Sequence, residues 1–308
     1  MAASHVLPPP DIDVIGSTST VKAREEDTLL DIARAHGLGY EDIVRANPDV
    51  DPWLPGEGTE VLLPTRFILP PGPREGIVLN LPELRLYYYR PTNPREVPVV
   101  ETYPVSIGRM DWATPLGIAK VVNKVRNPAW YPPESIRQEH AEDGEILPKV
   151  VPPGPDNPLG GFAMRLSIPG YLIHSTNKPA GVGMRVTHGC IRMYPENIEE
   201  LFDVVPVGTK VRIINEPYKV GWGVDSLYLE AHPPLDEDAE RAGRDMTVIT
   251  ELLVKATSER NVAVDWERIG VIFEEANGVP DSMAAVDATP VSVRNDEIAV
   301  VEPEQSAM

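Results

Sequence analysis

The sequence has 308 residues but only one cysteine, Cys190. A single thiol cannot form an intrachain disulfide, which excludes a disulfide scaffold without fixing the compartment. No apolar run approaches the roughly 18 residues that a membrane-spanning helix needs, so no membrane span is expected. The start, MAASHVLPPPD, has neither a basic segment nor an apolar stretch and is not predicted to be a signal peptide. An exported form would need a targeting segment upstream of this start.

Basic residues are also scarce, since 28 Lys and Arg face 47 Asp and Glu, a net charge of −19. Nucleic-acid binding is therefore not expected, because phosphate contacts need clustered Lys and Arg. The acidic residues are unevenly distributed along the chain. Residues 225–308 carry 19 acidic and 6 basic side chains, a net of −13, whereas residues 1–224 carry a net of −6. The acidic character thus belongs mostly to the C-terminal part and says little about an active site.

Phenylalanine is rare, with 4 residues, whereas proline is abundant, with 34. So many prolines argue against long uninterrupted helices and favour loops, strand edges and linkers. In other respects the composition is that of a soluble globular protein, with 42% hydrophobic and 24% charged residues. The length allows two or three small domains.

Residues 1–17 are Pro-rich and predicted to be extended, and residues 18–65 are predicted to form a compact unit. A strand is expected at 19–23, and Asp27 and Thr28 signal the start of a helix whose apolar residues recur at helical spacing. A second short helix is expected at 40–46 and a closing strand at 60–63. The predicted order is βααβ in under 50 residues.

This unit resembles a LysM module. The matching positions are Asp27-Thr28-Leu29, Ile32-Ala33, Ile43, Asn47-Pro48, Pro55-Gly56 and Leu63-Pro64. The family usually has Gly where this chain has Glu26. The resemblance implies binding of glycan that contains N-acetylglucosamine, with Asp27, Thr28, Asn47 and Pro48 as candidate contacts. The alternative is a small packing domain without a ligand.

A Pro-rich segment, 66–75, is predicted to be a stiff linker that leaves the units on either side separable. From 76 to 214 the pattern is one of many short strands with one helix at 195–205, interrupted by a long irregular stretch at 127–161 that holds eight prolines. This pattern predicts a mainly β domain, a β-sandwich or partly closed barrel. Loops as long as this stretch are either functional or disordered.

The remaining chain is predicted to be a helical, partly disordered extension. Within 215–279, a strand is expected at 226–231 and helices at 239–260 and 266–276. The end, 280–308, is acidic and lacks periodicity, which predicts disorder.

A lone cysteine is by default a small buried apolar residue, but three features favour a nucleophile at Cys190. A following helix, Arg192 and two histidines are expected to stabilise the thiolate and lower its pKa. His174 ends an apolar strand 16 residues earlier, and the glycines of the loop between them allow the chain to turn back. Gly189 permits a tight bend whose amides face an oxyanion. His188 either lines that pocket or shapes the loop, and His174 has the alternative of being an ordinary core histidine.

These residues, with several spaced motifs, resemble the YkuD-type L,D-transpeptidase catalytic domain over residues 76–214. The motifs are Ser106-Ile107-Gly108, Thr114-Pro115-Leu116-Gly117, Asn157-Pro158-Leu159-Gly160, Thr187-His188-Gly189-Cys190-Ile191-Arg192-Met193 and Val207-Gly208-Thr209. Thr187 stands where Ser is common, which keeps the hydroxyl.

The resemblance implies that Cys190 is the nucleophile and His174 its base, oriented by a backbone carbonyl next to Ser175. His188, Gly189 and Arg192 then shape the oxyanion and donor pocket. The family's thiolate attacks the stem tetrapeptide of peptidoglycan at the bond between the diamino acid and D-Ala, and an amine of another stem or of an outer-membrane lipoprotein resolves the thioester. No metal or cofactor is implied, and the substrate places the protein in the periplasm or cell envelope.

Three questions stay open from the sequence. Trp130 and Tyr131 lie in the long stretch before the nucleophile, which covers the cleft in this family, although Trp130 is equally compatible with a hydrophobic plug. A cysteine hydrolase that passes the acyl group to water would have the same residues. A non-catalytic wall-binding protein is disfavoured, because binding alone needs neither Cys190 nor His174.

Overall fold

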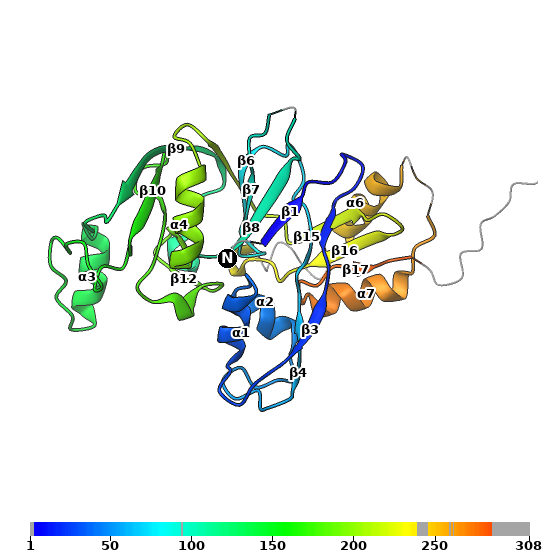
Figure 1. Cartoon of the computed structure of the whole chain (residues 1–308), viewed down its shortest axis with the longest axis horizontal. Helices are drawn as coiled ribbons and strands as arrows, with labels where there is room; N and C mark the ends of the chain where they lie inside the picture. Colours follow the sequence, from blue (N-terminus) through cyan, green and yellow to red (C-terminus); the bar gives the residue numbers. More distant parts are fainter. Residues whose placement is uncertain (1–2, 94, 239–245, 259, 261, 285–308) are drawn as a thin grey trace, which may run out of the picture.

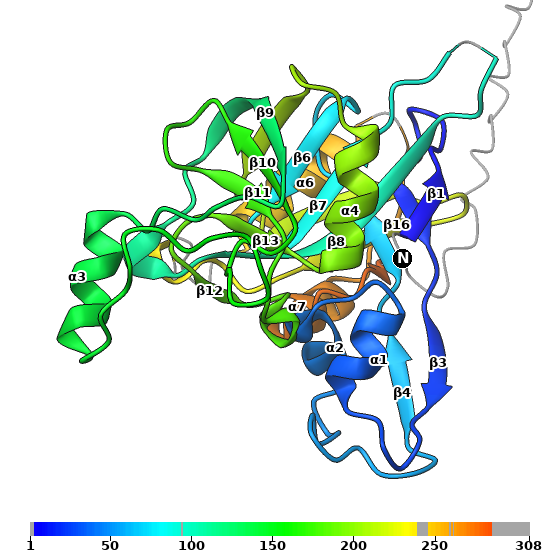
Figure 2. The same cartoon turned by 60° about the vertical axis from the view of Figure 1, so that its left-hand side comes forward.

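The computed structural model describes residues 3–93, 95–238, 246–258, 260 and 262–284. The largest sheet in this part of the chain has ten strands, of which eight close into a barrel in the order β8, β13, β11, β10, β9, β14, β6, β7 and back to β8. Figure 1 shows this sheet, and β11 and β13 are labelled in Figure 2. Strands β6 (Gly76–Asn80) and β14 (Lys210–Ile214) are parallel, as are β11 (Leu172–His174) and β13 (Ile191–Met193). The other barrel strands are β7 (Arg85–Tyr89), β8 (Val99–Gly108), β9 (Gly117–Arg126) and β10 (Phe162–Leu166). The prediction of a mainly β, partly closed barrel is confirmed.

The barrel encloses an apolar core that also takes in one helix, α4 (Pro195–Val204). Alternation along the strands decides which side chains enter this core. On β7, for example, Leu86 and Tyr88 belong to it, whereas Tyr87 and Tyr89 belong to a second apolar cluster. Both faces of β7 are therefore buried, and something else must cover the outside of the barrel.

The cover is the N-terminal unit. It consists of β3 (Ser19–Lys22), α1 (Leu29–Ala35), α2 (Tyr40–Ala46) and β4 (Glu60–Leu63), in the βααβ order expected from the sequence, with β3 and β4 antiparallel. Leu29 and Ile43 of its helices lie in the same apolar cluster as Val78, Tyr87 and Val100 of the barrel. The barrel and the βααβ unit thus share one core.

The segment 66–75 is not the separating linker that its prolines predict. Its first residues form β5 (Arg66–Ile68), which pairs with β2 (Val14–Gly16), and Phe67, Ile68 and Leu69 are buried. The apolar residues at its start fill the space between the two units, which the proline count does not reveal. Strands β1 (Ala3–Val6) and β12 (Arg185–Thr187) both pair with β8, so the N-terminal stretch also joins the barrel sheet.

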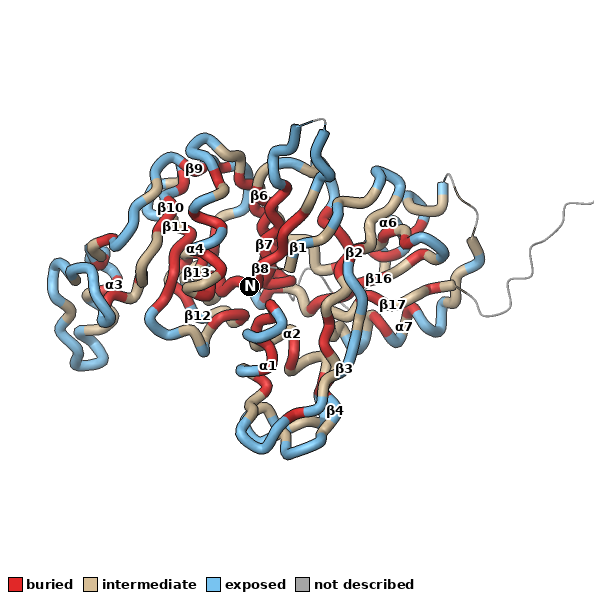
Figure 3. The backbone as a smooth tube through the Cα atoms, in the orientation of Figure 1, coloured by how far each residue is buried: buried red, intermediate tan, exposed pale blue. Residues whose placement is uncertain are grey.

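The C-terminal extension is an α/β unit and not only helical. A three-stranded sheet of β15 (Tyr218–Trp222), β16 (Leu227–Ala231) and β17 (Asp281–Ser282) packs on α6 (Thr247–Thr257) and α7 (Trp266–Glu275) around its own core (Figure 3). Helix α6 is shorter than the predicted 239–260, of which 239–245 lie outside the described residues. The tail was expected to be disordered from 280, but Met283 is buried in this core, and 285–308 lie outside the described residues.

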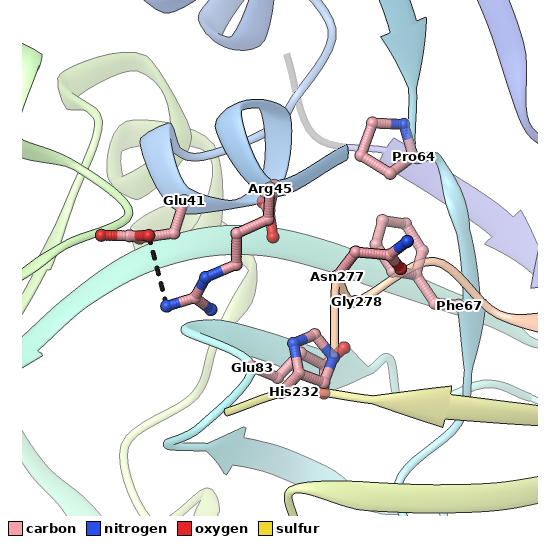
Figure 4. Close-up of a pocket in the computed structure, with 9 residues that line it drawn as sticks. Glu41, Arg45, Pro64, Phe67, Glu83, His232, Asn277 and Gly278 are labelled. Carbon is pink, nitrogen blue, oxygen red and sulfur yellow. Dashed lines mark ion pairs between the residues drawn. The ribbon is translucent and has the colours of Figure 1, made fainter. Parts of the chain in front are cut away.

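A buried ionic cluster joins this extension to the barrel. Lys219 on β15 lies 2.8 Å from both Glu83, beside β7, and Glu230 on β16, and all three side chains are at most 1% exposed. His232 bonds Glu230 at 2.7 Å, and Tyr87 donates to Glu83. Lys219 also donates to the carbonyl of Ile68 at 2.6 Å. Figure 4 shows the edge of this cluster, where Glu83 and His232 line a cavity of about 10 Å³ between the three parts of the chain.

Candidate active site

The pairing of β11 with β13 brings the two candidate catalytic residues to one side of the sheet. Ile173 lies opposite Ile191, and both are buried in the barrel core. Because side chains alternate, His174 at the end of β11 and Cys190, the residue immediately before β13, both lie on the side away from that core, whereas the strand pairing itself sets His174 opposite Arg192. The chain turns back between His174 and Cys190, as the sequence predicts, and the roles of the two side chains as base and nucleophile stay a prediction.

His174 is held as a neutral base. Its side chain is 5% exposed, and its Nδ1 lies 2.5 Å from the carbonyl oxygen of Ser175, which can only accept a hydrogen bond. The proton therefore sits on Nδ1 and leaves the lone pair on Nε2. Burial, and then the charge of Arg192, lower the pKa of His174 to about 4. At neutral pH the imidazole is uncharged and able to accept a proton.

Cys190 is a thiol in the resting site. Its Sγ lies 3.6 Å from the carbonyl oxygen of Gly170. Burial raises the pKa of Cys190 above its ordinary value, and a hydrogen bond from the backbone of Leu172 and the charge of Arg192 oppose the rise only in part. The expected lowering of the thiol pKa is therefore wrong in its net direction, because desolvation outweighs the nearby cation.

Arg192 places a cation beside the thiol. It lies opposite His174 in the strand pairing, and its Nε is buried without a hydrogen-bond partner among the described residues. Burial lowers the pKa of Arg192, whereas Cys190 raises it, and a guanidinium remains charged at neutral pH. A buried donor without a partner is costly, so this side of the site suits an anionic group of a ligand.

Two threonine hydroxyls fix the tight turn before Cys190. Gly189 adopts a φ of +95°, and a Cβ there would lie 2.9 Å from the ring of Tyr171, so only glycine fits. Thr114 accepts from the amide of Gly108 at 3.1 Å and donates to the carbonyl of Gly189 at 2.9 Å. Thr187 donates to the carbonyl of Cys190 at 2.6 Å. Thr114 belongs to one of the motifs that resemble the family. The sequence alone did not reveal that its hydroxyl links Gly108 to Gly189.

His188 contacts a helix that the sequence did not predict. Helix α3 (Glu134–Glu142) lies inside the stretch expected to be irregular, and its Glu139 bonds the Nε2 of His188 at 3.0 Å and pairs with Arg109. The ring of His188 also packs edge-on against Trp112. These contacts favour the interpretation that His188 shapes the loop over a direct role at the oxyanion.

The long stretch around α3 is ordered by Asn157. This side chain is buried and donates to the carbonyls of Pro128, Val151 and Pro152. Trp130 is half-buried and bridges Val151 through the backbone, whereas Tyr131 is 68% exposed. The two aromatic residues thus have different surroundings, and their role as a substrate lid stays a prediction.

The predicted glycan contacts are used within the βααβ unit itself. Thr28 caps α1 in a capping box with Asp31, and Asp27 accepts three bonds from Arg24. Asn47 is buried, and its amide group ties the end of α2 to Leu62 of β4. Pro48 follows at the surface. Trp53, 58% exposed in the loop before β4, was not singled out from the sequence, although an exposed tryptophan offers a large apolar ring and an N–H donor to a binding partner.

Among the described residues, Glu83, Glu230 and His232 form a group with metal-ligand spacing, but Lys219 already supplies the positive charge there. Every described helix is too short or too polar to cross a membrane.

Several known proteins are similar to this chain. Residues 74–213 match the family of YkuD L,D-transpeptidase catalytic domains. A probable L,D-transpeptidase ErfK/SrfK of Salmonella typhimurium is 38% identical over 92% of this chain and 92% of its own length. The probable L,D-transpeptidase YcfS of Escherichia coli is 42% identical over 75% of this chain and 73% of its own. The crystal structure of L,D-transpeptidase 3 from Mycobacterium tuberculosis aligns with 49% of this chain and 64% of that chain, at 20% identity and a TM-score of 0.33.

Proposed function

Because the chain belongs to the family of L,D-transpeptidases with a YkuD-type catalytic domain, we propose that it transfers the acyl group of a peptidoglycan stem peptide through a thioester on Cys190. The observation that carries this proposal is the placement of His174 at the end of β11 and of Cys190 directly before the neighbouring parallel strand β13, with Nδ1 of His174 bonded to the carbonyl of Ser175. That bond leaves Nε2 free to take the thiol proton.

The first half of the reaction forms the thioester. As Sγ of Cys190 attacks the carbonyl carbon between the diamino acid and D-Ala, its proton moves to Nε2 of His174. The imidazolium then gives this proton to the departing nitrogen, the C–N bond breaks, and D-Ala leaves. A resting thiol–imidazole pair suits this sequence, because charge develops only when the substrate has excluded water.

The second half transfers the acyl group. An amine attacks the thioester carbonyl and loses its proton to His174, the C–S bond breaks, and the proton returns to the sulfur. Turn amides at Gly189 and Cys190 are candidates for the oxyanion site in both halves. We assign Arg192 to the donor pocket, where its charge and its buried Nε, which has no hydrogen-bond partner among the described residues, suit a carboxylate of the stem.

The proposal also includes the acyl acceptor, the cellular location and the glycan contact. Another stem peptide or an outer-membrane lipoprotein is the proposed acceptor, and the substrate places the reaction in the periplasm or cell envelope. We propose that the LysM-like βααβ unit contacts the glycan strands through its exposed loop at Trp53, since Thr28 and Asn47 are occupied within the fold.

Product masses from purified tetrapeptide muropeptides test the reaction class. A transpeptidase joins two stems with the loss of one D-Ala, and the Cys190→Ala variant forms no such product. Tripeptide stems without any cross-linked product, in the presence of excess amine acceptor, would instead identify a hydrolase that uses the same site.

A further inference from the structure

Two glycines from distant parts of the chain touch next to the active site. Gly39 precedes α2 in the βααβ unit, and Gly183 lies in the loop between His174 and Cys190. A Cβ added to Gly39 would lie 2.7 Å from Cα of Gly183, and one added to Gly183 would lie 2.4 Å from the amide nitrogen of Tyr40. Separations under 3.0 Å do not occur for real Cβ atoms, so the two backbones pack at a distance that only glycine allows.

This close approach lets α2 bond the loop directly. The amide of Tyr40 donates to the carbonyl of Val182 at 3.1 Å, and that of Glu41 donates to the carbonyl of Gly183 at 3.2 Å. The first amides of a helix have no partner within the helix. Here they are satisfied by the backbone of an active-site loop.

The position of α2 is itself fixed by the barrel. Asp42 accepts from the amide of Gly39 at 2.8 Å and, with the same oxygen, from Arg85 at 2.6 Å. Arg85 lies on β7 and is fully buried. On the other side, Arg34 of α1 forms a bidentate pair with Glu196 of α4. The βααβ unit cannot shift relative to the barrel without breaking these charged contacts.

The same loop reaches the side of Arg192. The carbonyl of Gly181 accepts from the hydroxyl of Ser106 at 2.6 Å. A Cβ on Gly181 would lie 3.6 Å from a terminal nitrogen of Arg192. The loop continues into β12 and the turn that carries Cys190. Its backbone therefore forms part of the wall beside the cation assigned to the donor.

We propose that the βααβ unit positions the active site: Gly39 and the amide of Tyr40 hold the 177–185 loop so that the pocket beside Arg192 fits the donor stem peptide. This inference rests on the proposed function. It makes the N-terminal unit part of the donor site, whether or not the unit also contacts glycan. The pairing of β11 with β13 does not pass through this contact, so the proton transfer between Cys190 and His174 is expected to be independent of it.

Two variants test this role in the full-length chain. Gly39→Ala adds only the Cβ that meets Gly183, because Gly39 has a φ of −93° that any residue adopts. Tyr40→Pro removes the amide hydrogen that bonds Val182, and proline is well tolerated at the first position of a helix. Tyr40→Ala keeps that amide while losing the same side chain, and Gly270→Ala adds a Cβ into open space.

Release of D-Ala from a tetrapeptide stem gives kcat and KM, and alkylation of the lone thiol by iodoacetamide reports the Cys190–His174 pair. Gly39→Ala and Tyr40→Pro should raise KM about 10-fold or more, since a displacement of about 1 Å in a positioning group can cost about 100-fold. Alkylation, and the KM of Tyr40→Ala and Gly270→Ala, should match the wild type.

Folded Gly39→Ala or Tyr40→Pro protein with an unchanged KM would overturn the proposal. The proposal would also fail if either variant lost iodoacetamide alkylation and stem turnover to the same extent. It would fail as well if either variant had a lower melting temperature but a normal KM. Each result would indicate a purely structural role. A wild-type protein that releases no D-Ala would instead refute the proposed function, which the wild-type assay shows before any variant is compared.

Discussion

The position of one proton governs the chemistry at the scale of single residues. The carbonyl of Ser175 fixes the tautomer of His174, and burial keeps both this imidazole and the Cys190 thiol uncharged at rest. The substrate therefore binds beside a thiol and an imidazole that can exchange a proton but carry no buried charge. Arg192 is the charge that remains, and its Nε has no protein partner in the described chain.

The two histidines should differ sharply in importance. His174→Ala should lower the rate of thioester formation by about 10²–10⁴-fold, the usual cost of losing a general base. His188→Ala should cost less, because His188 bonds Glu139 and packs on Trp112. Single-turnover acylation by a carbapenem, followed by intact-protein mass, measures both rates. A larger loss in His188→Ala would reverse the two assignments.

The pH dependence of acylation follows from the pKa of His174. A protonated imidazole cannot accept the thiol proton, so kcat/KM should fall as the pH drops through the pKa of about 4, well below the 6.5 of an ordinary histidine. Arg192→Gln removes a charge that lowers this pKa, so its acidic limb should move to higher pH. The pH profiles of D-Ala release between acidic and neutral pH show the acidic limb of the wild type and that of Arg192→Gln. A wild-type limb near 6.5 would contradict a buried neutral base.

At the scale of elements, we expect that a single substitution at Glu139 increases the local opening of helix α3. Glu139 joins it to both His188 and Arg109, and Glu139→Gln removes the charge from this link. The free energy of unfolding should change by less than about 1 kcal/mol, because the pair is partly exposed. Hydrogen exchange should be faster in α3, and Glu142→Gln at the exposed end of the same helix serves as the control. Unchanged exchange in α3 would show that Glu139 does not hold it.

The elements also show which parts of the fold were visible in the sequence. The βααβ order and the longer barrel strands carry their own periodicity and turn residues, so both were predicted, whereas the three-residue strand β13 was not. Helix α3 has only Ile136 buried, which leaves no apolar face to detect. Strands β1 and β5 are short and are defined by distant partners, which composition cannot reveal. In the site, the chain order suggested Cys190 and His174, but the contact with Glu139 and the net effect of burial on the thiol pKa depend on tertiary packing.

At the scale of the whole molecule, three parts of the chain are joined by buried contacts. The βααβ unit shares an apolar cluster with the outer face of the barrel, and the C-terminal unit is joined to the barrel through Lys219, Glu83 and Glu230. Burying such charges is costly unless each is paired. The arrangement therefore favours a single relative placement of the parts, which keeps the loop at Gly183 against α2.

The buried cluster makes a stability prediction. Lys219→Met leaves two carboxylates buried without their cation and should lower the free energy of unfolding by about 3–5 kcal/mol. The control is Lys210→Met, which removes a lysine paired with Glu75 at an exposed site and should cost less than about 1 kcal/mol. Urea unfolding gives both values. Equal effects of the two substitutions would show that the cluster does not join the parts.

The thioester on Cys190 is the central claim, and intact-protein mass after brief reaction with a tetrapeptide stem tests it most directly. The wild type should gain the mass of the stem minus that of free D-Ala, because a tripeptide acyl group replaces the thiol hydrogen and that hydrogen leaves with D-Ala. Hydroxylamine should remove this adduct, and Cys190→Ala should never form it. An adduct that persists in Cys190→Ala, or D-Ala release by that variant at the wild-type rate, would contradict the account.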